Sequence, residues 1–178
     1  NYNCKITTTT ISEEQYQLAC QRVKDAGMQD RIEIVKKDYR LLTGQYDKLV
    51  SIEMIEAVGL AYLGNYFEKC ASLLKPAGKM LIQAITIADQ QYEFSKRNVD
   101  FIQRYIFPGG ALPSVTALTN TATNKTDLRM TALEDITGHY ATTMRKWREK
   151  FYLNVEQITE LGYDNRFLRM WEYYLCYC

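Results

Sequence analysis

The sequence predicts an α/β fold with a mostly parallel sheet. Segments of strand and helix character alternate along the first half of the chain, in the order β-α-β-β-α-β, which is typical of helices that connect parallel strands. The composition is that of a globular protein, with 47% hydrophobic and 24% charged residues among 178. A chain of this length buries roughly 70% of its unfolded surface, so one core is expected without a disulfide or metal.

The first strand and helix are predicted from β-branched residues and a capping pattern. Residues 5–9 are short and rich in threonine, as strands are. Ser12 and Gln15 have the spacing of an N-cap residue and its N3 partner, so a helix should follow and run to about Ala26. Gly27 suits the left-handed position after a helix.

Three more strands and a helix complete the α/β pattern. Residues 31–36 alternate in strand fashion, and residues 46–52 read as a buried strand. A helix is expected over residues 61–74, closed by the turn at residues 75–78. Residues 79–87 form the last strong strand candidate.

The second half of the chain has a helical character. Residues 100–105 predict a short helix, 107–110 a turn, 113–124 a polar helix and 129–136 a strand. Apolar residues then step at three and four positions, which predicts one long helix. Its apolar face consists of Tyr140, Met144, Trp147, Phe151, Val155, Ile158 and Leu161.

Asp164 is positioned to cap a final helix. The apolar residues of that helix are Phe167, Trp171, Tyr174, Leu175 and Cys178.

Charge and cysteine content exclude several classes of protein. The formal net charge is +1, so overall charge predicts neither nucleic-acid binding nor electrostatic attachment to membranes. The cysteine count is five and no pair has CxxC spacing, which argues against disulfide frameworks and zinc sites and favours a reducing cytoplasm. No metal site is expected.

Five motifs together resemble the cyclopropane-fatty-acyl-phospholipid synthase and mycolic acid cyclopropane synthase family. They occur in family order and at family spacing over nearly the whole chain. They are TISEEQ at 10–15, YDKLVSIEMIE at 46–56, DFIQRYIFPGG at 100–110, GHY at 138–140 and RMWEYYL at 169–175. The DFIQRYIFPGG run is the most specific of them.

The resemblance implies a class I S-adenosylmethionine-dependent methyltransferase fold, Rossmann-like and incomplete, with a helical lid insertion. Residues 1–178 would be part of one methyltransferase domain, and about 88–145 would form the lid and acyl-binding segment. The glycine loop that holds the cofactor, a further active-site cysteine and the last strands are expected outside this chain. We therefore expect the chain alone to bind S-adenosylmethionine weakly and to be inactive.

The activity that the resemblance implies is methylene transfer to unsaturated phospholipid acyl chains, which forms a cyclopropane ring. Its partners would be these acyl chains at the inner face of the cytoplasmic membrane, with a homodimer left open and no nucleic acid. The alkene attacks the sulfonium methyl, and a base then removes a proton from the new methyl group. Positioning and exclusion of water should therefore dominate catalysis.

The family places a bicarbonate ion in the site as this base. By resemblance its holders here are Glu56, Tyr140 and Cys178. Glu56 can accept the ion's O–H proton, while Tyr140 can donate through its hydroxyl and Cys178 weakly through its thiol or a neighbouring amide. The family often has histidine where this chain has Gln83, a neutral donor and acceptor that can hold an anion without titrating.

The cofactor contacts implied by the resemblance lie after the predicted strands. Thr10, Ile11 and Gln15 match the strand end and helix start, whereas an acid and an aromatic residue match the turn that holds adenine. These two are Asp38 and Tyr39, and Ile52 matches a contact at the methionine end.

Less specific interpretations compete for each of these residues. Ser12 and Gln15 suffice as a helix cap, Glu56 as a solvated acid at a helix start, and Tyr140 and Cys178 as packing residues. Two other functions also stay open. One is a methyltransferase that acts on another lipid or small molecule and makes a methylated product without a ring, and the other is a non-catalytic fragment.

Overall fold

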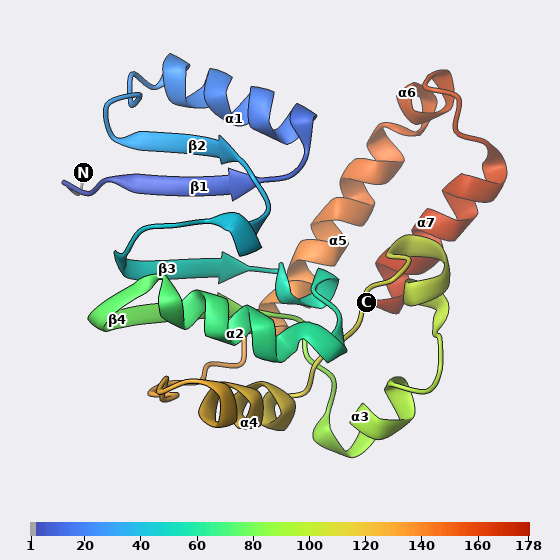
Figure 1. The fold of residues 1–178 in the computed structure, drawn as a ribbon. Coiled ribbons are helices and arrows are strands. Elements are labelled where there is room, and N and C mark those ends of the chain that lie inside the picture. Colours follow the sequence, from blue (N-terminus) through green and yellow to red (C-terminus); the bar gives the residue numbers. More distant parts are fainter. Residues whose placement is uncertain (1–2) are drawn as a thin grey trace. The chain divides into compact units, whose positions relative to one another are not determined.

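The computed structural model describes residues 3–178, and the first two residues of the predicted domain lie outside this range. The chain divides into two compact units (Figure 1). The first unit runs to Ile85 and includes Asn120–Leu128. The second consists of Thr86–Thr119 and Arg129–Cys178.

The first strand pair and its helix agree with the sequence prediction. Strands β1 (Ile6–Thr10) and β2 (Ile32–Lys36) pair in parallel, connected by helix α1 (Glu13–Asp25). The Ser12 hydroxyl accepts a hydrogen bond from the Gln15 backbone N–H and so caps α1. Such a cap contributes about 1 kcal/mol to helix stability. Gly27 has a φ of 62°, the left-handed conformation expected after the helix.

The second strand pair is parallel too, but its second strand begins and ends earlier than the predicted 79–87. Strand β3 (Tyr46–Ile52) pairs with β4 (Leu74–Gln83). The segment expected as a turn, residues 75–78, lies inside β4, where the register shifts between Tyr46 and Lys48. Ala77 absorbs the irregularity with a φ of 63°. Among the described residues the parallel pairs therefore form two separate two-stranded sheets, β1-β2 and β3-β4.

The core of the first unit lies on helix α2 (Leu63–Ser72). Its buried residues are spaced at three and four positions, so they share one face: Leu63, Tyr66, Phe67 and Cys70. The helix is shorter than the predicted 61–74 because Leu74 already belongs to β4. Three short 3₁₀ turns connect these elements, at Tyr39–Leu41, Ile55–Ala57 and Leu60–Tyr62.

The middle of the chain departs most from the prediction. The segment after Gln83 leaves β4, and Ile87 makes only an isolated parallel bridge with Ser114. Helix α3 (Asp89–Ser95) was not predicted, whereas α4 (Val115–Lys125) was. The expected short helix is a π-helical turn at Ile102–Ile106. Residues 129–136 have no regular structure, so the predicted strand there is wrong.

The last third of the chain is helical, as predicted, but the long helix is interrupted. Helix α5 (Thr137–Leu153) ends at Asn154, and α6 (Val155–Glu160) follows. The Asn154 side chain donates to the Lys150 carbonyl at 2.6 Å, a local bond that competes with the helical ladder. Asp164 caps α7 (Asn165–Tyr177) through the Phe167 N–H, as expected. The core of this unit consists of Met144, Phe151, Tyr174 and Leu175.

Candidate active site

Most of the predicted site residues lie at the carboxyl ends of the strands in the first unit. The arrows of β1, β2 and β3 point the same way in Figure 1, and β4 is parallel to β3. Segments that follow parallel strands meet at one sheet edge, which is where α/β proteins bind ligands. The residues placed there are Thr10, Ile11, Gln15, Asp38, Tyr39, Ile52, Glu56 and Gln83.

Polar contacts fix the turn between β1 and α1. The Thr10 hydroxyl donates to Gln15 Oε1 at 2.7 Å and accepts from the Ser12 N–H at 3.1 Å. Gln15 therefore bonds Thr10 and does not reach back to Ser12, as a capping box would have required. Between them Ile11 is 79% exposed, an apolar side chain at a strand end that could pack on a ligand.

Asp38 lies two residues after β2, and its carboxylate is ionised. It accepts from the Arg40 backbone N–H at 2.9 Å and from the Arg40 side chain at 3.0 and 2.6 Å. Hydrogen bonds from Arg40 lower the pKa of Asp38 from 3.8 to about 2. The Lys37 N–H donates to the Thr10 carbonyl at 3.0 Å, which ties this turn to the end of β1.

Replacing Arg40 should release the Asp38 carboxyl group. We expect Arg40→Gln to return the pKa of Asp38 from about 2 towards 3.8. A lowered pKa stabilises the fold above the ordinary pKa, and this contribution disappears as the pH falls through the folded value. Wild type and variant should therefore differ in stability at neutral pH and converge at the acidic end. Carboxyl NMR titration measures the pKa, and Lys37→Gln, which removes the charge beside Asp38 in sequence, is the control.

Tyr39 packs against the core of the first unit. Its ring lies 5.7 Å from that of Tyr66 in an edge contact, and Tyr66 contacts Phe67 at 5.5 Å in the same manner. Burial raises the pKa of the Tyr39 phenol. The candidate adenine contact is therefore held in place by α2.

Glu56 sits in a turn that is pinned by the core. Its neighbour Ile55 is only 1% exposed, which anchors the turn Ile55–Ala57 after β3. Glu56 Oε1 accepts the Ile85 N–H at 2.6 Å, just beyond β4. Its other oxygen, Oε2, is buried and has no hydrogen-bond partner within residues 3–178. Ile52, at the end of β3, is 58% exposed.

The Gln83 side chain is hydrogen-bonded to Glu53, a residue that the sequence did not indicate as functional. Its Nε2 donates to Glu53 Oε1 at 2.9 Å, and its backbone carbonyl accepts the Glu53 N–H at 2.9 Å. Part of the donor capacity expected for an anion is thus already used. Nothing in the sequence pattern distinguishes Glu53 from a solvated acid after a strand, because the pairing depends on the β3–β4 register.

Tyr140 and Cys178, the other two catalytic candidates, belong to the second unit. Tyr140 lies on α5 and packs, half-buried, against the core of that unit. Cys178 follows α7 and is exposed, but partial desolvation of its thiol, with a smaller effect of Asp100, raises the pKa of Cys178. At neutral pH this thiol therefore keeps its proton and can donate.

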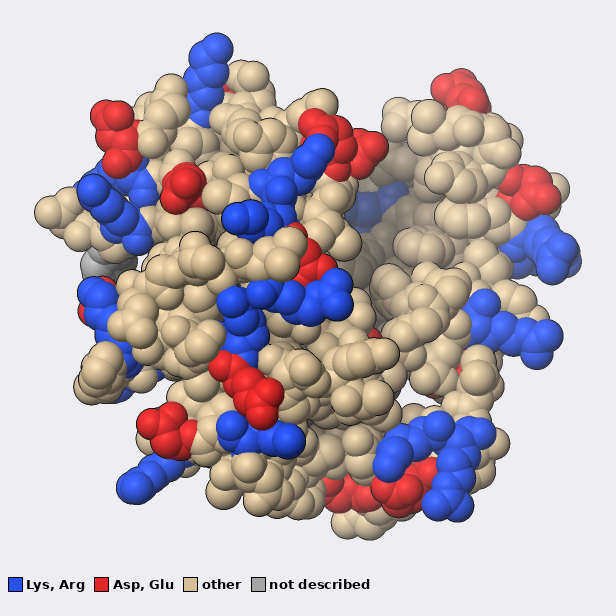
Figure 2. All heavy atoms as spheres, in the orientation of Figure 1, with Lys and Arg blue, Asp and Glu red and all other residues tan. Residues whose placement is uncertain are grey.

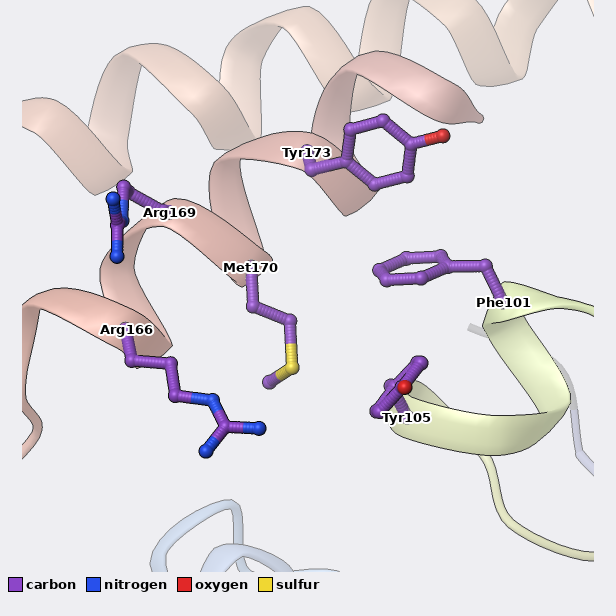
Figure 3. A pocket seen from close by; sticks show the side chains of 6 residues that line it. All are labelled: Phe101, Tyr105, Arg166, Arg169, Met170 and Tyr173. Carbon is purple, nitrogen blue, oxygen red and sulfur yellow. The ribbon is translucent and has the colours of Figure 1, made fainter.

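The second unit also carries a hollow of about 330 Å³ with an aromatic wall. Phe101 and Tyr105 face Met170 and Tyr173 across it (Figure 3). Phe101 meets the Tyr173 ring edge to face at 4.7 Å. The hollow is completed by Arg166 and Arg169.

The residues that follow the strands of the first unit offer acceptors and apolar groups of the kinds that S-adenosylmethionine requires. An ionised Asp38 can accept from an adenine amino group, and exposed Ile11 and Ile52 can pack on apolar parts of the cofactor. The unpartnered, buried Oε2 of Glu56 suits a ligand that donates an O–H, as bicarbonate can.

Two further features were not found in the described part of the chain. No group of three His, Cys, Asp or Glu side chains within residues 3–178 could hold a metal ion. No helix there combines the length and apolar character needed to cross a bilayer. Basic and acidic side chains are interspersed on the face drawn in Figure 2.

Comparison with known proteins gives consistent matches over the whole chain. The family described as mycolic acid cyclopropane synthetase matches residues 1–178. The tuberculostearic acid methyltransferase UfaA1 of Mycobacterium tuberculosis is 44% identical over 97% of this chain and 40% of its own length. The cyclopropane-fatty-acyl-phospholipid synthase of Escherichia coli K12 is 35% identical over 100% of this chain and 44% of its own length. The chain thus spans less than half of either relative.

Solved structures give the same fold. The cyclopropane synthase MmaA2 of Mycobacterium tuberculosis matches 98% of this chain and 64% of its own with a TM-score of 0.86 at 20% identity. The mycolic acid cyclopropane synthase CmaA1, solved with SAH and CTAB, has a TM-score of 0.85 at 24% identity over 98% of this chain and 64% of its own. The chain therefore belongs to the mycolic acid cyclopropane synthetase family and has the class I S-adenosylmethionine-dependent methyltransferase fold.

Proposed function

We propose that the full-length protein transfers a one-carbon group from S-adenosylmethionine to the double bond of an unsaturated phospholipid acyl chain. The observation that carries this proposal is that the cofactor candidates and Glu56 follow the carboxyl ends of the two parallel strand pairs of one unit, in a chain of this family. When bound, S-adenosylmethionine supplies its sulfonium methyl to the alkene, which leaves a carbocation until a proton is lost from the new methyl group. The cyclopropane ring closes with that loss.

The residues of the first unit have distinct tasks in this proposal. Asp38 and Tyr39 orient the adenine, and Thr10, Ile11, Gln15 and Ile52 line the rest of the cofactor. Glu56 receives a proton at Oε2 while the Ile85 N–H holds Oε1. Glu56 would hold a bicarbonate ion by accepting from its O–H; the ion would supply the base, and Glu56 would carry the proton away.

Tyr140 and Cys178, both in the second unit, are proposed as hydrogen-bond donors for catalysis. The raised pKa of Cys178 supports this role, because a protonated thiol donates and adds no negative charge. Residues 88–145 are proposed as the lid over the acyl chain. Exposed apolar side chains within that segment support this part of the proposal, notably Phe94, Val99, Tyr105 and Phe107.

The test is chemical conversion by the full-length protein. Incubation with S-adenosylmethionine and vesicles of unsaturated phospholipid should add one CH₂ for each double bond, detected by mass spectrometry of the acyl chains. Vesicles of saturated phospholipid are the control and should gain nothing. Cofactor binding without any gain in acyl mass would exclude the proposed activity.

A methyltransferase that forms no ring is the second candidate. It is favoured by the higher identity to the tuberculostearic acid methyltransferase, 44%, than to the cyclopropane synthase, 35%. Proton NMR of the product decides, because a cyclopropane has strongly shielded ring protons and an open-chain product lacks them.

A further inference from the structure

Glu53 has a backbone conformation that side chains rarely adopt. Its φ is 48°, and within the described residues only Ala77 shares this property among non-glycine residues. It lies directly after β3, between Ile52 and the turn that carries Glu56. Strained residues at a ligand-binding edge persist when the surrounding contacts hold them, and they are often functional.

Two hydrogen bonds hold Glu53 against the end of β4. Its N–H donates to the Gln83 carbonyl at 2.9 Å, and its Oε1 accepts from Gln83 Nε2 at 2.9 Å. The first bond continues the parallel pairing of Ile52 with Gln83 by one residue. The left-handed turn therefore places a carboxylate against the side chain of a residue in the candidate site.

The carboxylate decides which way the Gln83 amide points. A carboxylate accepts hydrogen bonds but cannot donate, so Nε2 must face Glu53 and Oε1 must face away from it. Without Glu53 both orientations of the amide would be open. The carboxylate also puts a negative charge next to the side chain that would otherwise hold an anion through its N–H groups.

We propose that Glu53 is a positioning residue that fixes the Gln83 amide and weakens anion binding at that side chain. The negative charge of Glu53 then favours the positively charged sulfonium and carbocation. Acceptance of the proton depends on Glu56. This inference rests on the proposed function for its role in turnover. The orientation of Gln83 and its effect on anion affinity can be measured without turnover.

The first test is the NMR signal of the Gln83 side-chain amide in the full-length protein, assigned by its loss in Gln83→Leu. In the wild type its protons should exchange with water roughly tenfold more slowly than those of exposed Gln45, as expected for a bond to a charged acceptor.

Glu53→Gly accepts the left-handed φ and removes the carboxylate, so the protection should vanish. Glu53→Gln keeps an acceptor and should retain most of it. Unchanged protection in Glu53→Gly would refute the positioning role.

The second test measures bicarbonate affinity directly. Carbon-13 NMR of labelled bicarbonate should show about three- to tenfold tighter binding to Glu53→Gln than to the wild type, because one nearby negative charge is gone. Glu33→Gln removes an exposed carboxylate from β2 and should leave the affinity unchanged. Equal affinities of wild type and Glu53→Gln would overturn the electrostatic part. If methyl transfer is absent while both results hold, the proposed function fails and the role of Glu53 at this edge stands.

Discussion

Glu56→Gln should lower the turnover of the full-length protein by about 10²-fold or more, the range lost when a positioned acid–base group is removed. The glutamine carbonyl can still accept the Ile85 N–H, so the turn should keep its shape. What changes is the buried Oε2, which becomes an NH₂ group that cannot take up a proton. Cofactor affinity should change by less than about twofold, since the cofactor candidates are other residues.

Turnover by product mass spectrometry and cofactor affinity by calorimetry separate these two effects. Glu68→Gln is a suitable control, because Glu68 is an exposed acid of the same unit, 3.9 Å from Lys125. It should leave both quantities unchanged. Parallel losses of turnover and cofactor affinity in Glu56→Gln would remove Glu56 from the proton transfer and make it a structural residue.

Tyr66→Ala should destabilise the first unit by about 3–5 kcal/mol, the cost of emptying a large aromatic site in a core. Tyr66 is 1% exposed and its ring packs edge to face on both Tyr39 and Phe67. Because Tyr39 is the candidate adenine contact, cofactor affinity should fall as well. Urea unfolding followed by circular dichroism gives the stability, and calorimetry gives the affinity.

Tyr66→Phe is the matched control for the hydroxyl group. The Tyr66 hydroxyl is buried beside Ser51 and Cys70 but makes no hydrogen bond of normal geometry within the described residues. Removing such a poorly bonded polar group should change stability by only about 1 kcal/mol. A loss as large as that of Tyr66→Ala would show that the hydroxyl, and not the ring packing, holds the unit together.

The elements with strong local signals were predictable from the sequence. Strand β3 and the caps at Ser12 and Asp164 were confirmed, because strand propensity and a capping side chain act on near neighbours. The expected burial of β3 was wrong, since Val50 and Ile52 are 62% and 58% exposed and Ser51 is its one buried residue. Elements that depend on distant partners were missed or misplaced. Residues 75–78 were expected as a turn, yet pairing with β3 draws them into β4 despite the irregularity at Ala77.

The sequence by itself determined the family and the α/β class, because motifs and periodicity are properties of the chain. Only the tertiary structure decided how the candidate site residues are held. Arg40 fixes the ionised state of Asp38, and the Ile85 N–H leaves one buried oxygen of Glu56 without a partner. The bond between Glu53 and Gln83 joins residues thirty positions apart, and it exists because parallel pairing brings the ends of β3 and β4 together.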